Sequence, residues 1–461
     1  MVTKIYNQEY KQLLMNNSIQ NSPRNLALET LDKVFQRGAY SNLQLNETLK
    51  RHQLKEVDKR LVTTLVYGVL QHKLNLEYWL TPLVKRDPDS WVKTLLMLSF
   101  YQYQFMDRIP EWATTDEAIK IAKWRGNPGI RKFVTGVLHS FLRQGPADPL
   151  EIADPIQRLS IIGSIPEWLV RCLLHQYGQE QVEKLVHQIN EPSRISLRVN
   201  TARTTVQEAI QTLANEQIDV QQSKVAQDGL VVQSGNVLTS AAFANGTVTI
   251  QDESAMLAVE ALQLRGDERV LDACAAPGGK TGQIAAALDP ATGQVDALDI
   301  HQHKVRLIRK NMERLGVADR VVARQLDARQ VDDYFTDESF DKILVDAPCS
   351  GIGLIRRKPE IRYDKTSSTS SRLHEIQGAI LNAVAPKVKK GGIIVYSTCT
   401  ILQEENENTV QTFLAHHPNF QLLKTQTARA IKANRQQKTL TILPSDYGSD
   451  GFFIGTLQRI K

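Results

Sequence analysis

The chain has 461 residues, 23% of them charged, and a formal net charge of +6. At about 150 residues per domain, this length predicts roughly three domains rather than one. Only four cysteines are present, with no Cys-x-x-Cys pair, which argues against a disulfide scaffold or a metal site and favours a reducing, cytoplasmic compartment.

The positive charge lies in the first third of the chain. Residues 1–150 contain 21 Lys and Arg against 14 Asp and Glu, and the remainder is nearly neutral. This asymmetry favours a polyanion-binding module joined to a catalytic one, although charges scattered over solvated helix faces would explain it too. Residues 1–20 form a polar tail without a signal-peptide core, and no stretch offers the about 20 apolar residues of a membrane helix. We therefore expect no membrane association.

Residues 21–145 are predicted to form an all-α bundle. Leu65, Val66 and Val69 recur at helical spacing, and strand-like alternation is absent. A linker rich in Gly and Pro follows at residues 145–149 and marks a domain boundary.

Residues 156–247 are predicted to form a small α+β subdomain. The region begins with helical segments and continues with an alternating strand at 195–200. A helix at 206–213 and short strands near Val231 and Thr249 complete the pattern.

From residue 248 to 461 the pattern changes to alternating strands and helices, which predicts a doubly wound, mainly parallel sheet. The expected strands are 270–272, 295–299, 321–323, 343–345, 393–396 and a closing strand at 452–455. Residues 425–440 match no motif.

A glycine-containing turn follows the first of these strands, in Cys274-Ala-Ala-Pro-Gly-Gly279-Lys280-Thr. Its small residues let the backbone approach a ligand closely. A Walker A loop would need glycine where Cys274 stands, and the dinucleotide fingerprint is absent, so the turn favours a nucleoside without a pyrophosphate, such as S-adenosylmethionine. Asp299, at the end of the second strand, suits the ribose hydroxyls, and Asp327, after the third strand, suits the adenine amino group.

Two cysteines each follow a predicted buried strand: Cys349 in Asp346-Ala-Pro-Cys-Ser-Gly, and Cys399 in Tyr-Ser-Thr-Cys-Thr. Because the carboxyl ends of parallel strands meet at one edge of a sheet, we expect both thiols near a single pocket. Two thiols in one pocket indicate covalent chemistry. The residues alone do not decide which thiol attacks.

These motifs, together with Gly351–Pro359 and Glu404-Glu405-Asn406, resemble those of the Sun-type RNA cytosine-5 methyltransferases. The helical region 21–145 resembles the NusB-type RNA-binding domain through Phe133–Leu138, although Thr135 stands where Asn would be expected. Residues 156–247 are similar to the family's RNA-binding subdomain. This combination is the layout of bacterial enzymes that methylate 16S ribosomal RNA. The resemblance implies an all-α NusB-like bundle over 21–145, an α+β RNA-binding subdomain over 156–247, and a Rossmann-like S-adenosylmethionine-dependent methyltransferase domain over 248–461.

The resemblance also implies roles for individual residues. Cys399 would be the nucleophile, and Cys349 would assist proton removal and product release. Asp346 would hydrogen-bond the base and border the cofactor, with Lys280 in support. The implied cofactor site comprises Cys274, Ala275, Ala276, Pro277, Gly278, Gly279, Lys280, Asp299, Asp327 and Asp346. The implied RNA contacts are Arg198, Arg356, Arg357 and Lys358, the last three because they follow the active-site loop and could hold phosphates around a flipped-out cytosine.

Three other functions compete with a monomeric enzyme acting on 16S ribosomal RNA. A Sun-type enzyme for transfer RNA would share every catalytic motif, and only the NusB-like front end disfavours it. A non-catalytic RNA-binding or antitermination factor would not need two thiols on one rim. A small-molecule methyltransferase would not need about 250 residues of additional helical and α+β structure.

Overall fold

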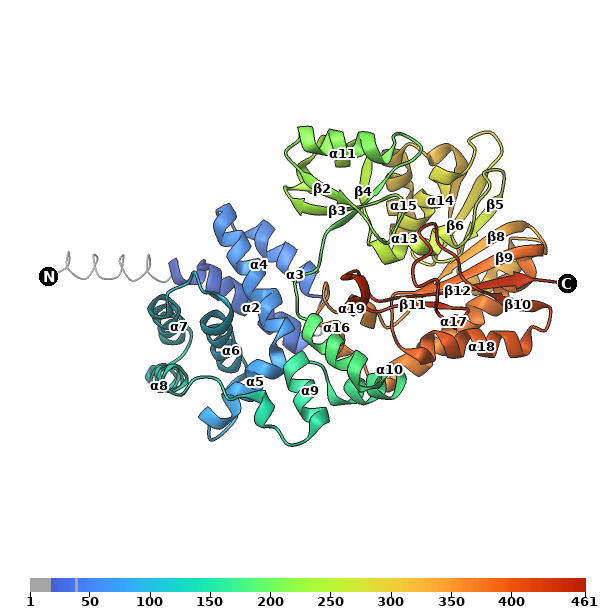
Figure 1. The fold of residues 1–461 in the computed structure, drawn as a ribbon. Helices are drawn as coiled ribbons and strands as arrows, with labels where there is room; N and C mark the ends of the chain where they lie inside the picture. The colour runs from blue at the N-terminus through green and yellow to red at the C-terminus, as the bar shows by residue number, and fades with distance from the viewer. Residues whose placement is uncertain (1–17, 38–39) are drawn as a thin grey trace. The chain divides into compact units, whose positions relative to one another are not determined.

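The computed structural model describes residues 18–37 and 40–461, which form two compact units (Figure 1). The first unit comprises the chain up to Asn190 together with Arg357–Asp364, and the second comprises Glu191–Arg356 and Lys365–Lys461. The polar tail expected over 1–20 lies outside the described residues as far as residue 17. None of the described helices combines the length and apolarity needed to cross a bilayer.

The first unit is helical, as the pattern over 21–145 predicts. Its helices are α2 (Pro23–Arg37), α3 (Ser41–Arg51), α4 (Glu56–Gln71), α5 (Lys73–Leu80), α6 (Ser90–Phe105), α7 (Glu111–Arg125), α8 (Pro128–Gln144), α9 (Pro155–Gly163), α10 (Glu167–Gln188) and the short α16 (Ile361–Asp364). Helix α8 begins at a capped N-terminus, because the Asn127 side chain accepts a hydrogen bond from the amide of Ile130. Helices α9 and α10 are part of this compact helical unit, whereas the sequence pattern groups them with the middle region.

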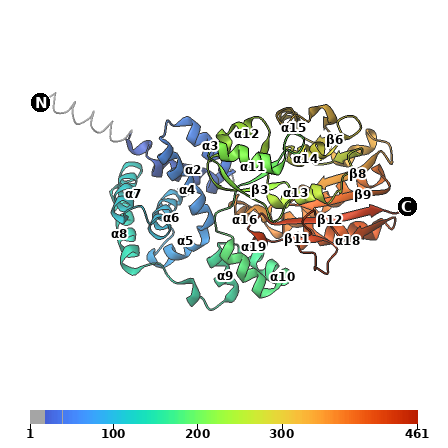
Figure 2. The ribbon, with the colours of Figure 1, turned by 45° about the horizontal axis from the view of Figure 1, so that its top comes forward.

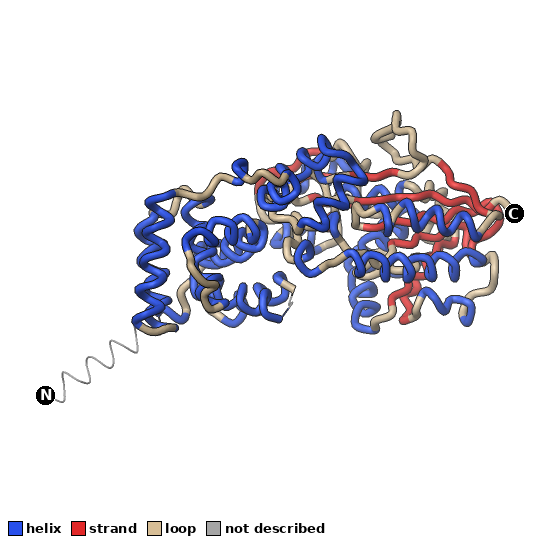
Figure 3. The backbone as a smooth tube through the Cα atoms, turned by 90° about the horizontal axis from the view of Figure 1, so that it is seen from below, coloured by secondary structure: helices blue, strands red, loops and turns tan. Residues whose placement is uncertain are grey.

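The second unit contains all the described strands, drawn red in Figure 3. Its smaller sheet has the order β2-β3-β1-β4 with antiparallel neighbours. The strands are β1 (Ser196–Val199), β2 (Asp219–Gln222), β3 (Gly229–Ser234) and β4 (Val248–Ile250), with helices α11 (Val206–Asn215) and α12 (Ala241–Ala244). All four residues of β1 are buried, although its alternating sequence predicts one exposed face. The second face is covered because Arg198 reaches the carbonyl oxygen of Gly279.

The larger sheet has the order β10-β12-β9-β8-β5-β6-β7, with β11 paired to β12. The strands are β5 (Arg269–Asp272), β6 (Gln294–Asp299), β7 (Val321–Gln325), β8 (Phe340–Asp346), β9 (Val388–Thr398), β10 (Phe420–Leu423), β11 (Leu440–Ile442) and β12 (Phe452–Arg459). All neighbours from β9 to β7 are parallel, and β12 pairs antiparallel with β9. Every strand expected in this domain is present, whereas β10 and β11 are additions.

Helices cover both faces of this sheet, as expected for a doubly wound domain (Figure 2). On one face pack α13 (Glu253–Glu260), α14 (Gly279–Ala287) and α15 (Gln302–Leu315). On the other pack α17 (Ser367–Val384) and α18 (Glu407–His416). The strand order reverses between β5 and β8, so the crevice beyond their carboxyl ends is the place where such a sheet binds ligands.

Candidate active site

The glycine turn joins β5 to α14. Gly278 has a φ of +101°, a left-handed conformation that favours glycine. The Thr281 hydroxyl donates to the Oδ2 atom of Asp272 at 2.7 Å, which ties the first turn of α14 to the end of β5. Burial raises the pKa of Asp272 to about 7.

A cavity of about 440 Å³ lies beyond the carboxyl ends of the parallel strands. Its walls come from the ends of five parallel strands, the loops after them, and helices α15 and α17. They are formed by Ala273, Cys274, Ala276, Asp299, Ile300, Lys304, Asp327, Ala328, Arg329, Asp346, Ala347, Pro348, Cys349, Ile376, Ile380 and Cys399. The cavity therefore gathers both cysteines and the three carboxylates of the expected cofactor site. Ala275, Pro277, Gly278, Gly279 and Lys280 are not among the residues that line it.

The two distal carboxylates are held by neighbouring groups. Asp299 accepts a hydrogen bond from the amide of His301 at 2.8 Å, and Lys304 lies 3.8 Å from its second oxygen. Asp327 forms a 2.6 Å ion pair with Arg329, and hydrogen bonding to that guanidinium lowers the pKa of the Asp327 carboxyl. Both carboxylates line the cavity.

Several residues that line the cavity carry no motif in the sequence. Lys304 and Arg329 lie within five residues after Asp299 and Asp327, respectively. This proximity in sequence is the only feature that would have predicted their place in the cavity. Ile376 and Ile380 lie four residues apart on α17, so they share one apolar face of that helix. They add an apolar wall to a polar cavity.

The thiols of Cys349 and Cys399 lie 3.1 Å apart. Asp346 and Ser397 are partners in the parallel pairing of β8 with β9, so the loops that follow leave the sheet at the same edge. Hydrogen bonding to Cys399 and burial raise the pKa of the Cys349 thiol well above its ordinary value. Cys349 is therefore a protonated thiol at neutral pH, available to exchange a proton.

Lys280 and Asp346 form an ion pair beside the thiols, with 2.7 Å between Nζ and Oδ2. The hydroxyl of Ser397 donates to the other carboxylate oxygen at 2.9 Å. Burial lowers the pKa of Lys280, but the charge and hydrogen bond of Asp346 outweigh it, and the pKa is raised overall. Lys280 therefore stays positively charged and orients the Asp346 carboxylate.

Cys274 lines the cavity and also packs against the core formed by β5, β8 and α17. Burial raises the pKa of its thiol. A protonated, packed thiol is a poor nucleophile, so Cys274 contributes to the wall of the site. Among the residues that the structure describes, no group of His, Cys, Asp and Glu is arranged to hold a metal ion.

Two of the expected RNA contacts need correction. Arg198 is only 2% exposed and donates to the carbonyl oxygen of Gly279 at 2.9 Å. Arg356 is 7% exposed, and its guanidinium donates to the carbonyl oxygens of Glu191, Pro192 and Gly448. Both guanidinium groups are buried within the second unit and donate to backbone carbonyl oxygens, so neither lies on the protein surface where an RNA phosphate would be met.

Arg357 and Lys358 differ from these two buried cations. Arg357 is half-buried and Lys358 is exposed. Both belong to Arg357–Asp364, the short segment assigned to the helical unit. An RNA contact by either residue stays a prediction.

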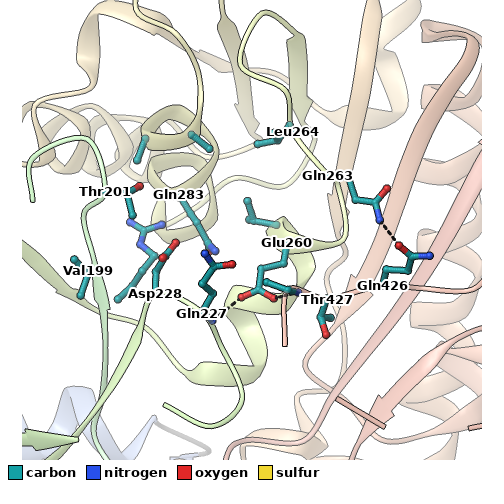
Figure 4. A pocket seen from close by; sticks show the side chains of 15 residues that line it. Val199, Thr201, Gln227, Asp228, Glu260, Gln263, Leu264, Gln283, Gln426 and Thr427 are labelled. Atoms are coloured by element: carbon teal, nitrogen blue, oxygen red, sulfur yellow. Dashed lines mark hydrogen bonds between the residues drawn. The ribbon is translucent and has the colours of Figure 1, made fainter. Parts of the chain in front are cut away.

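A larger cavity of about 570 Å³ lies elsewhere in the second unit and contains neither cysteine (Figure 4). Glu260 lies in its wall, where its carboxylate accepts hydrogen bonds from the amides of Gln227 and Ala428. Gln263 donates to Gln426 nearby. These contacts give the segment 425–440 a structural role, because its first residues bond to Glu260 at the end of α13, which also holds the loop between β2 and β3.

Three family models match successive parts of the chain. The NusB family matches residues 21–143, a ferredoxin-like domain of RsmF/B-like methyltransferases matches 165–238, and the 16S rRNA methyltransferase RsmB/F family matches 259–458. These matches follow the order of the domains expected from the sequence. The ferredoxin-like match begins before α10, which the structure places in the helical unit.

Full-length relatives show the same similarity. The chain is 43% identical over 445 residues to the probable ribosomal RNA small subunit methyltransferase B of Bacillus subtilis, covering 95% of this chain and 99% of the relative. It is 31% identical to the probable enzyme of the same name from Synechocystis, with the same coverage of both chains. The crystal structure of PH0851 superposes with a TM-score of 0.79 at 25% identity and covers 96% of this chain and 99% of its own.

Proposed function

This chain belongs to the ribosomal RNA small subunit methyltransferase B family, and we propose that it methylates carbon 5 of a cytosine in 16S ribosomal RNA through a covalent cysteine adduct. S-adenosylmethionine is the methyl donor of such enzymes. The observation that carries the covalent chemistry is the pair of thiols, 3.1 Å apart, in the wall of the cavity that also holds Asp299 and Asp327.

The cofactor fits the cavity by its chemistry. Asp299 and Asp327 offer carboxylate oxygens to ribose hydroxyls and an adenine amino group, and Ile376 and Ile380 offer an apolar surface to the purine ring. Cys274 and Ala276 of the glycine turn line the same cavity. When bound, S-adenosylmethionine supplies an electrophilic methyl group.

Cytosine requires activation because its carbon 5 belongs to an aromatic ring and is a poor nucleophile. In the proposed reaction the Cys399 thiolate bonds to carbon 6, which makes carbon 5 enamine-like and able to take the methyl group. A base then takes the carbon-5 proton, and the electron pair of that bond re-forms the double bond between carbons 5 and 6. At the same time the bond between carbon 6 and Sγ breaks, and Cys399 leaves as a thiolate. The assignment of attack to Cys399 rather than Cys349 rests on family resemblance.

Cys349 is suited to the second half of this reaction. Its raised pKa makes it a thiol when the base binds, and its Sγ atom lies beside that of Cys399. We assign it to proton exchange and release of the methylated product.

Asp346 and Lys280 are suited to hold the base. The Asp346 carboxylate lines the cavity and can accept a hydrogen bond from the exocyclic amine or from a protonated ring nitrogen 3. Lys280 orients this carboxylate through its 2.7 Å contact. Ser397 fixes the other carboxylate oxygen, so the group has little freedom to turn away.

The choice of ribosomal RNA is supported by the relatives' names and by the match of residues 21–143 to the NusB family. Lys358 is an exposed cation nine residues after Cys349 and is a candidate phosphate contact. A base must leave its helix to reach a thiol, so we expect the enzyme to act on an accessible or flipped cytosine.

The proposal is tested on a denaturing gel with S-adenosylmethionine and 16S ribosomal RNA. Cys349→Ala should yield a denaturant-resistant protein–RNA adduct, because attack proceeds and release fails. Cys399→Ala should yield no adduct, and the double variant serves as the matched control. An adduct only in Cys399→Ala would reverse the two roles. Absence of an adduct with both 16S ribosomal RNA and transfer RNA would overturn the covalent mechanism, and an adduct with transfer RNA alone would overturn the substrate.

A further inference from the structure

Two consecutive buried residues, Glu405 and Asn406, hold the loops that carry the cysteines. Both side chains are fully buried, and neither lines the 440 Å³ cavity. They follow Cys399 by six and seven residues, at the junction of the loop and helix α18. A buried carboxylate needs several hydrogen bonds to be stable, so its partners indicate what it positions.

Glu405 holds the Cys349 loop. Its Oε2 atom accepts a hydrogen bond from the amide of Ser350, the residue next to Cys349, at 2.7 Å. Gln377 donates to the same oxygen at 3.2 Å and also to the carbonyl oxygen of Pro348 at 3.0 Å, on the other side of Cys349. Ser370 donates to Oε1 at 3.0 Å. The backbone on both sides of Cys349 is therefore anchored to one carboxylate and its glutamine partner on α17.

Asn406 holds the Cys399 loop in the same way. Its amide nitrogen donates to the carbonyl oxygen of Thr400 at 3.0 Å, and its amide oxygen accepts from the hydroxyl of Thr398 at 2.5 Å. The residues on both sides of Cys399 are thus fixed by one side chain. A hydrogen bond of 2.9 Å between the hydroxyls of Ser350 and Thr400 links the two loops directly.

We propose that Glu405 and Asn406 are positioning residues with separate tasks, Glu405 for release by Cys349 and Asn406 for attack by Cys399. This inference rests on the proposed covalent function. The thiols lie 3.1 Å apart, and small displacements of reacting groups cost about 100-fold in rate. Substituting Glu405 should therefore impair product release and leave attack in place, and substituting Asn406 should impair attack.

Glu405 also acts on Cys349 through its charge. It is one of the groups that raise the pKa of the Cys349 thiol, after the contact with Cys399 and burial. In Glu405→Gln the pKa of Cys349 should fall, because a neighbouring negative charge is removed. The basic limb of the pH–rate profile should then move to lower pH, a change that a purely structural role would not produce.

The test measures adduct formation, turnover and thermal melting in full-length variants. Glu405→Gln keeps the shape of the side chain. It places an NH₂ group, which cannot accept a hydrogen bond, among the donors of Ser350, Ser370 and Gln377. We expect turnover to fall about 100-fold while the RNA adduct accumulates, as in Cys349→Ala. Asn406→Ala should form adduct about 100-fold more slowly and should not accumulate it. Glu404→Gln is the matched control, because Glu404 contacts Ser371 rather than a cysteine loop.

Milder variants keep the test decisive if either substitution prevents folding. Ser370→Ala removes one donor to Glu405, and Thr398→Val removes the hydroxyl that Asn406 accepts from. We expect Ser370→Ala to accumulate adduct and Thr398→Val to form adduct more slowly, each to a smaller extent. Wild-type behaviour of Glu405→Gln, or loss of adduct in it, would overturn the division of tasks, provided that Cys349→Ala still accumulates adduct in parallel. If Cys349→Ala also forms no adduct, the failure belongs to the proposed function instead.

Discussion

The backbone amide of Gly353 donates a hydrogen bond to the carbonyl oxygen of Cys399 at 3.0 Å. The carbonyl oxygen of Gly353 in turn accepts from the amide of Gly451. The loop that follows Cys349 is therefore attached directly to the backbone of the second cysteine. A side chain at position 353 would collide with the carbonyl oxygens of Gly451 and Cys399. Close packing of main chain therefore helps to set the distance between the loops, together with the hydrogen bond between Ser350 and Thr400.

Gly353→Ala should therefore reduce methyl transfer by about 100-fold or more and lower the melting temperature, because backbone must move to admit the methyl group. Gly378→Ala is the control. A Cβ at Gly378, within α17, would meet no atom within 4 Å, so this variant should be active and stabilised by about 0.5–1 kcal/mol. Wild-type activity in Gly353→Ala would show that the loops tolerate separation.

Asp272→Asn should change how stability depends on pH. Burial raises the pKa of Asp272 to about 7 in the folded protein, from an ordinary value of 3.8. The folded state therefore binds a proton more tightly than the unfolded state. The contribution of the Asp272 carboxyl to stability is present below about pH 4. This contribution is lost as the pH rises towards 7, by up to about 1.4 kcal/mol per pH unit. Because an asparagine does not titrate, Asp272→Asn does not lose this stability as the pH rises.

Denaturant unfolding at pH 5 and pH 8 measures the effect. The stability of Asp272→Asn relative to wild type should increase between these pH values. The matched control is Asp267→Asn, which makes the same substitution at an exposed position. A constant difference for Asp272→Asn would show that its carboxyl does not titrate in this range.

Asp299→Ala should weaken binding of S-adenosylmethionine by about 10- to 100-fold, the loss expected for hydrogen bonds to a charged group. Isothermal titration calorimetry without RNA measures this affinity directly. Asp333→Ala, at an exposed position outside the cavity, should bind as wild type does. An unchanged affinity in Asp299→Ala would remove this carboxylate from the cofactor site.

Arg356→Ala should affect stability, whereas Lys358→Ala should affect RNA binding. Arg356 satisfies three carbonyl oxygens in the interior of the second unit, so its loss should reduce stability by about 3 kcal/mol. Lys358 is exposed, so Lys358→Ala should melt as wild type does but bind RNA more weakly, with the salt slope reduced by about 1. Thermal melting and RNA titrations at several salt concentrations separate the two. Unchanged RNA binding in Lys358→Ala would exclude the phosphate contact.

The large sheet was predictable because buried parallel strands require continuous apolar runs, and Ile343–Val345 and Ile393–Tyr396 are such runs. Strands β10 and β11 were not, because Phe420–Leu423 and Leu440–Ile442 are short and lie beyond β12 at the antiparallel side of the sheet. Partners distant in sequence stabilise them, and local pattern carries little of that information.

For the site, the sequence by itself determined that Cys349 and Cys399 share one edge of a sheet, because parallel strands end together. Only the tertiary structure decided that their thiols touch, that Lys280 engages Asp346, and that Glu405 and Asn406 hold the two loops. It also decided that Arg198 and Arg356 are buried rather than on the surface. The physical reason is that a charged residue's environment depends on carbonyl and carboxylate groups far away in the chain, which meet it only after folding.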